Sequence, residues 1–145
     1  MALIALSTKA TADRAISIVR KPAHNDQASG IAAEAITAGA PVRLDTTTGR
    51  FTNANGTTAP EARVMFIATR TVAAGEAVTG VRNCTLEGYV LDSVAYDGAI
   101  FLADTDGRLG DAAGTVSVTI GRVVPGFATT LGTAADKLLD VARLA

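Results

Sequence analysis

Aromatic side chains are scarce in this sequence, which has two Tyr, four Phe and no Trp among its 145 residues. A chain of this length folds by default as one domain, and folding buries roughly 70% of the surface that the unfolded chain exposes. The core must therefore consist of Val, Ile, Leu and Ala, whose individual buried areas are modest. We expect part of the apolar surface to be buried against other copies or another protein.

Cysteine and histidine are almost absent, with a single residue of each, Cys84 and His24. One cysteine cannot form an intramolecular disulfide, and a zinc centre needs more Cys and His ligands than the chain supplies. We interpret Cys84 as a small apolar residue on a strand. The G-x-S-x-G, P-loop and G-x-G-x-x-G patterns are also missing. The sequence predicts a protein that is not an enzyme and that uses no metal and no cofactor.

Charge is both low and balanced, with 13 basic and 14 acidic residues that together make 19% charged residues. In soluble domains, charged residues typically make up about 25% of the sequence. Without a basic excess, nucleic acid is not expected as a partner. No apolar run approaches the ~18–20 residues that a membrane span needs, and the first residues lack the basic stretch of a signal peptide. A membrane is therefore not expected as a partner either.

The main positive signal is a sequence motif that occurs twice, which we call the repeated phrase. Residues 39–51 have the sequence GAPVRLDTTTGRF, and residues 98–109 have the sequence GAIFLADTDGRL. Each copy contains Gly-Ala, an apolar run, an Asp-Thr turn and then Gly-Arg, which is the pattern of a β-hairpin. A partial third copy, AAGEAVTGV, occupies residues 73–81. The repeat predicts an all-β domain built from similar hairpins.

Further strands are expected where apolar residues run together or alternate with polar ones. They cover 63–68, which we place at the centre of a sheet, and 77–82, 85–91 and 115–124. Strand signals at intervals of about 10–15 residues are typical of a sandwich or a barrel. The secondary structure of two segments is left undecided by the sequence. Residues 31–37 are compatible with a helical turn or a strand, and residues 133–145 with a helix or a final strand. For 133–145 we favour the strand.

The chain divides by composition into an N-terminal arm, residues 1–30, and a β domain, residues 31–145. The arm has a strand-like run at 15–19 and a polar stretch with Pro and Gly at 21–30, which predicts a loop. We expect the arm to be ordered by a partner, the alternatives being a disordered tail or a plain edge strand. Its basic residues are the candidate partner-binding residues: Lys9, Arg14, Arg20 and Lys21.

The acidic turn at 104–107, with Asp111 nearby, resembles part of a calcium loop. An EF-hand loop ends in a bidentate Glu at position 12, where this chain has Thr115. The equivalent turn of the first copy carries Thr46, Thr47 and Thr48 in place of acidic ligands. We therefore interpret residues 104–107 as a hairpin turn, because Asp-Gly favours positive φ angles.

The sequence around these repeats also resembles that of a known protein family. Residues 35–51 fit A-x-x-x-G-x-P-V-x-L-D-x-x-T-G-R-F, and similar patterns cover 74–81, 97–102 and 120–124. Together they resemble the small capsid cement, or decoration, proteins of tailed bacteriophages. The likeness extends over roughly residues 31–143 and rests on structural motifs rather than on a diagnostic residue.

The resemblance implies a small β-barrel or β-tulip-like domain with an extended N-terminal arm. It implies a homotrimer, made in the host cytoplasm, that binds the outer surface of the expanded capsid in the virion and bridges major capsid proteins. Alternatives are another virion component, such as a head fibre or tail protein, and a non-enzymatic ligand-binding β-module. The last usually needs surface aromatics, whereas we expect Tyr89, Tyr96 and the Phe residues in the core.

Overall fold

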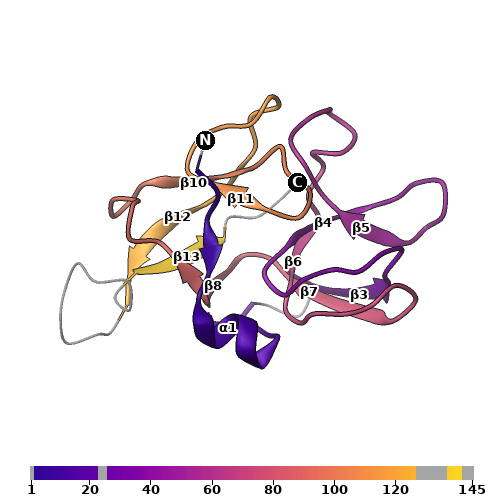
Figure 1. Ribbon diagram of the computed structural model, residues 1–145, viewed down its shortest axis with the longest axis horizontal. Helices are drawn as coiled ribbons and strands as arrows, with labels where there is room; N and C mark the ends of the chain where they lie inside the picture. Colours follow the sequence, from indigo (N-terminus) through magenta and orange to yellow (C-terminus); the bar gives the residue numbers. More distant parts are fainter. Residues whose placement is uncertain (1, 23–25, 127–136, 142–145) are drawn as a thin grey trace.

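The computed structural model describes residues 2–22, 26–126 and 137–141, which form a mostly β structure with one short helix (Figure 1). The all-β expectation is confirmed. In chain order the elements are β1 (Ala5–Leu6), α1 (Thr8–Asp13), β2 (Ser17–Arg20), β3 (Gln27–Ile31), β4 (Pro41–Leu44), β5 (Phe51–Asn53), β6 (Phe66–Ala68), β7 (Ala77–Val81), β8 (Cys84–Glu87), β9 (Tyr89–Val90), β10 (Ala99–Leu102), β11 (Leu109–Gly110), β12 (Thr119–Pro125) and β13 (Lys137–Val141).

The strands form three antiparallel sheets. Six strands pair in the order β11-β10-β12-β13-β8-β2, five in the order β3-β7-β6-β4-β5, and β1 pairs with β9. Figure 1 shows the six-stranded and five-stranded sheets side by side, joined by the chain between β7 and β8. Among the described residues none of the sheets closes, so the barrel expectation is not supported. Closure depends on pairing between edge strands, which the spacing of strand signals does not specify.

Both full copies of the repeated phrase are hairpins, as predicted. β4 pairs with β5 and β10 pairs with β11, each antiparallel. The equivalent glycines of the two turns, Gly49 and Gly107, have φ angles of 70° and 65°. In the partial copy, Gly75 has a φ of 86° just before β7. Each copy thus uses its glycine for a left-handed backbone that other residues adopt at a cost.

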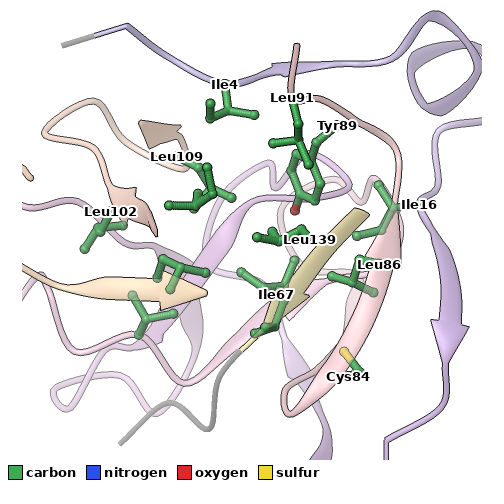
Figure 2. Packing of buried hydrophobic residues seen from close by; sticks show 14 of the residues in the cluster. Ile4, Ile16, Ile67, Cys84, Leu86, Tyr89, Leu91, Leu102, Leu109 and Leu139 are labelled. Carbon is green, nitrogen blue, oxygen red and sulfur yellow. The ribbon is translucent and has the colours of Figure 1, made fainter. Parts of the chain in front are cut away.

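The buried side chains form two clusters. The larger lies between the two main sheets and joins Ile67 and Val81 of the five-stranded sheet to Leu86 and Leu139 of the six-stranded one. Figure 2 shows Ile67, Leu86 and Leu139 converging there, with Cys84 at the start of β8. The smaller cluster covers the other face of the five-stranded sheet. There Phe51 and Phe66 meet edge to face, with ring centroids 4.8 Å apart.

Residues of the expected arm are packed onto the domain. β2 pairs with β8 and β3 pairs with β7, at the edges of the two main sheets. Ile4, Ala10 and Ile16 belong to the larger buried cluster. The described part of this segment therefore corresponds to the edge-strand alternative. The polar stretch 21–30 was predicted as a loop, but its last four residues belong to strand Gln27–Ile31, because backbone pairing with β7 forms whatever the side chains are.

Strand pairing decides much of the secondary structure of the two segments that the sequence left undecided. Within 31–37, Ala32 bridges to Phe51 and Ile36 bridges to Val72, so the helical turn is wrong. Lys137–Val141 is a strand inserted between β12 and β8, as we favoured, with Leu138 and Leu139 buried. The rest of this segment, residues 133–136 and 142–145, lies outside the described residues.

Candidate interaction surface

Strand β2 is the most exposed strand of the six-stranded sheet. Its four residues are all exposed, and Ile18 and Val19 keep 37% and 40% of their surface accessible. Among the described residues β2 pairs only with β8, and the register shifts between Ile18 and Arg20. The outer edge of β2 therefore presents backbone groups, and Ile18 and Val19 are exposed on the same strand. An edge of this kind is suited to binding another polypeptide.

Arg20 lies at the end of β2 and belongs to a polar network. Its guanidinium lies 3.0 Å from Asp140 of β13 and donates to the hydroxyl of Thr85 in β8. Asp140 also lies 3.9 Å from Arg122 of β12, whose guanidinium contacts Asp97 at 3.2 Å. The network crosses four neighbouring strands. Arg20 thus has an intramolecular partner already, and exposed pairs of this kind add little stability.

The other three basic residues lie on separate parts of the same segment. Lys9 is exposed on α1, Arg14 follows the helix as its left-handed cap with a φ of 56°, and Lys21 is exposed just after β2. Lys9 lines a shallow hollow whose other lining residues include Asp13 and Glu87. Arg20 thus belongs to the exposed strand, whereas Lys9 and Arg14 precede it and Lys21 follows it in the chain. The role of all four residues in partner binding stays a prediction.

Helix α1 and the exposed apolar pair were not identified from sequence. The helix had a signal, because Ser7 is its N-cap and accepts a 3.1 Å hydrogen bond from the amide of Ala10. Ile18 and Val19 lie in the run that was predicted as a strand. Periodicity could not show their exposure, because two adjacent apolar residues in a strand point to opposite faces and suggest burial on both sides.

Reactive side chains in the described residues are buried or engaged. Cys84 is inaccessible, and burial raises the pKa of its thiol to about 11. Burial also raises the pKa of Tyr89 far above its usual range, and its hydroxyl donates to the carbonyl of Gly39. The thiolate and phenolate forms are both disfavoured. Thr85, buried on β8, donates to Asp140. His24 lies outside the described residues.

The acidic turn behaves as a structural turn. Asp104 accepts hydrogen bonds from the amide and hydroxyl of Thr115, at 2.9 and 2.8 Å, and Asp106 accepts from the side chain of Asn55 at 2.6 Å. The turn's oxygens thus tie β10–β11 to neighbouring loops. No group of three or more His, Cys, Asp or Glu side chains that could hold a metal ion occurs within residues 2–22, 26–126 and 137–141.

Aromatic residues are partly internal, and the expectation that they lie in the core needs two corrections. Phe51, Phe66 and Tyr89 are buried, whereas Phe101 is half-buried and Tyr96 keeps 39% of its surface exposed, with the Lys137 ammonium 5.2 Å from its ring centroid. Tyr96 lies in a turn rather than on a strand. A single accessible ring is a poor platform for sugar stacking. Phe127 lies outside the described residues.

Comparison of the chain with protein-family models, curated proteins and solved structures finds no match. The resemblance to phage decoration proteins therefore stays a hypothesis based on the residues quoted above. Within the described part of the chain, no helix is both long and apolar enough to cross a membrane.

Proposed function

We propose that this protein is a non-enzymatic structural component of a tailed-phage virion. It binds the outer surface of the expanded capsid, bridges neighbouring major capsid proteins and stabilises the head. The observation that carries the proposal is the repeated hairpin phrase, whose two full copies form β4–β5 and β10–β11 with a left-handed glycine at the same place. Within this proposal the open sheets correspond to the β-tulip-like domain that the resemblance implies.

The exposed strand β2 supports a binding role. A cement protein needs surface that can pair with another polypeptide, and β2 offers a sheet edge with Ile18 and Val19 beside it. The basic residues of the segment, including Lys9 and Lys21, would meet acidic capsid surface. In this proposal β2 and its flanking residues contact the major capsid protein, so that partner binding uses part of the 1–30 segment.

A homotrimer would strengthen weak individual contacts. Three copies that engage a lattice at once gain effective concentration, so modest interfaces produce firm retention. Closed three-fold symmetry also matches a three-fold position between capsomers. The low charge and the small aliphatic side chains of the chain suit a protein that gains stability by association.

The test is addition of the purified protein to expanded capsids that lack a decoration protein. We expect saturable binding over the whole shell, measured by cosedimentation. We also expect the decorated capsids to rupture at a higher temperature than bare capsids do, measured by the fluorescence of a dye that binds the released DNA. The double variant Ile18→Ser/Val19→Ser should bind less. The control Ile31→Ser removes a side chain of similar exposure, 43%, from the five-stranded sheet and should bind normally.

Other results would redirect the proposal. Binding without any change in rupture temperature would contradict the cementing role. Labelling confined to a tail or a single vertex would favour another virion component. Equal loss of binding in the Ile31→Ser control would remove β2 from the interface while leaving capsid binding intact.

A further inference from the structure

The two full copies of the repeated phrase differ in how their first strands are covered. Leu44 of β4 lies opposite Phe51 of β5. Leu102 of β10 lies opposite Leu109 of β11, so it is the equivalent of Leu44. In both hairpins the amide that follows the leucine donates to the carbonyl of the turn arginine. Yet Leu102 is fully buried, whereas Leu44 keeps 36% of its surface exposed.

In the second copy, the side of β10 that faces away from β11 is occupied by the chain leading into β12. The amide of Leu102 donates a 2.9 Å hydrogen bond to the carbonyl oxygen of Val118, just before β12 begins at Thr119. Val116 and Val118 pack against the larger buried cluster. A short segment with valines at alternate positions thus completes the pairing of Leu102.

In the first copy, the same side of β4 is open beyond Val42. β6 pairs with β4 at Pro41 and Val42, and this register would place Val64 opposite Leu44. The amide of Val64 donates instead to Ala62, at 3.0 Å. The carbonyl of Val42 accepts a hydrogen bond on this side, so the backbone of Leu44, two residues on, also points to it. Among the described residues, no backbone group pairs with Leu44 there.

A pocket of about 400 Å³ lies along this open side of β4. Arg43 and Leu44 point to opposite faces of the strand, yet both line the pocket, so the pocket follows the strand edge rather than one face. Ligand sites typically have volumes of about 300–1,000 Å³, a range that includes this one. The lining residues are Arg43, Leu44, Thr46, Pro60, Arg63 and Met65.

The charges around the pocket favour no ionic ligand. The Arg43 charge interacts with the carboxylates of Glu34, Asp45 and Glu61. Each of these carboxylates also accepts a hydrogen bond from an amide or a hydroxyl nearby. What the pocket offers is the unpaired backbone of Leu44 beside apolar side chains. That combination suits an uncharged polypeptide segment, which brings both backbone groups and apolar surface.

We propose that this pocket binds an uncharged, extended segment of a partner protein. The segment pairs with the backbone of Leu44 as Val118 pairs with Leu102 in the second copy. β-Branched residues at its alternate positions lie against the apolar lining, as the valines of residues 116–118 lie against the larger cluster. Unpaired strand edges bind other chains in this way. The pocket is separate from β2, and the inference does not depend on the capsid role.

The first experiment measures amide hydrogen exchange in the full-length protein by ¹⁵N NMR. In the free protein we expect the amide of Leu44 to exchange much faster than that of Leu102, its equivalent. The probe is the peptide N-acetyl-Thr-Val-Ser-Val-Thr-amide, which has the sequence of residues 115–119. We expect the peptide to shift the Leu44 resonance saturably and to slow its exchange. Slow exchange of Leu44 in the free protein, or no saturable shift, would overturn the proposal.

A comparison peptide tests whether backbone pairing is responsible. Methylation of the second Val nitrogen keeps the side chains and removes one backbone donor, so we expect this peptide to bind much more weakly. Equal binding of the two peptides would overturn strand pairing in favour of a plain apolar contact.

A matched pair of variants tests the location. Arg63→Trp adds a large ring at an exposed lining position, and we expect it to weaken peptide binding about tenfold or more in the same titration. Arg50→Trp makes the same change at an exposed position outside the pocket and should bind normally. Equal weakening in both variants would overturn the proposal. Absence of peptide binding, together with loss of a homo-oligomer in Arg63→Trp, would overturn it in favour of a second copy of this chain.

Discussion

The hydroxyl of Tyr89 donates a 2.7 Å hydrogen bond to the carbonyl oxygen of Gly39, a residue 50 positions earlier in the chain. The bond joins β9 to the loop before β4, and both residues are buried. Gly39 has a φ of 86°, and a Cβ at this position would lie 2.9 Å from Leu6 and 3.1 Å from the Tyr89 hydroxyl. The N-terminal strand β1, β9 and the first hairpin therefore meet at one point.

Loss of this hydroxyl should destabilise the fold without changing its core volume. Tyr89→Phe leaves the buried carbonyl of Gly39 without this donor, and we expect it to lower the free energy of unfolding by about 1–2 kcal/mol in urea titrations. Ser93→Ala, which removes a hydroxyl from an exposed residue, is the control and should have little effect. Equal stability of Tyr89→Phe and the wild type would show that water replaces the bond.

The two hairpin glycines should differ in sensitivity although they occupy equivalent positions. Gly49→Ala adds a Cβ that meets no atom within 4 Å, so only the left-handed backbone costs energy, about 1–2 kcal/mol. A Cβ at Gly107 would lie 2.6 Å from the Asn53 side chain, which adds about 1–3 kcal/mol of overpacking. Chemical unfolding of both variants measures the difference. Equal losses would mean that Asn53 moves aside freely.

The N-terminal segment can be tested as part of the domain with a matched pair of isoleucines. Ile16 is 7% exposed and Ile18 is 37% exposed, two residues apart. Ile16→Ala should lower the free energy of unfolding by about 2–4 kcal/mol, because it opens a cavity in the larger cluster. Ile18→Ala should stay within about 0.5 kcal/mol of the wild type. If Ile16→Ala were also neutral, the segment would behave as a separable arm.

Cys84 should make the fold less stable at alkaline pH. Burial raises the pKa of its thiol from 9.0 to about 11, so between these values the unfolded thiol ionises while the folded one keeps its proton. The unfolded state then binds fewer protons, and stability falls as pH rises. We expect wild type to lose more stability than Cys84→Ala between neutral pH and about pH 10.

Thiol accessibility offers an independent check on the same residue. Ellman's reagent should react slowly with the native protein and rapidly once urea unfolds it, because the thiolate is the reactive species. Rapid reaction of the native protein would contradict the burial of Cys84. Parallel pH profiles of wild type and Cys84→Ala would assign the alkaline instability to other groups, Tyr89 among them.

Local features of the fold could be predicted from the sequence, and features set by distant partners could not. The β4 strand lies inside the hairpin predicted for residues 39–51, because Pro41 begins it and the Asp45 turn ends it, all within a few residues. By contrast β6 begins at Phe66 and β12 at Thr119, later than the apolar runs indicate. Strand ends there depend on where neighbouring strands stop pairing, which the apolar pattern does not report.

The candidate surfaces divide in the same way. Arg20 was identified from its charge, but its contact with Asp140 joins residues 120 positions apart. The exposure of Ile18 depends on which strands cover it, and neither residue type nor spacing specifies that.

The sequence by itself determined the all-β class, the two hairpins and the aliphatic core, because turn chemistry and side-chain alternation act over a few residues. Only the tertiary structure decided that Gln27–Ile31 is a strand, that Lys137–Val141 takes the favoured strand form between β12 and β8, that the sheets formed by the described residues stay open and that β2 lies at an edge. The physical reason is that strand pairing satisfies backbone groups across large sequence separations, and the choice among possible partners is made by the packing of the whole chain.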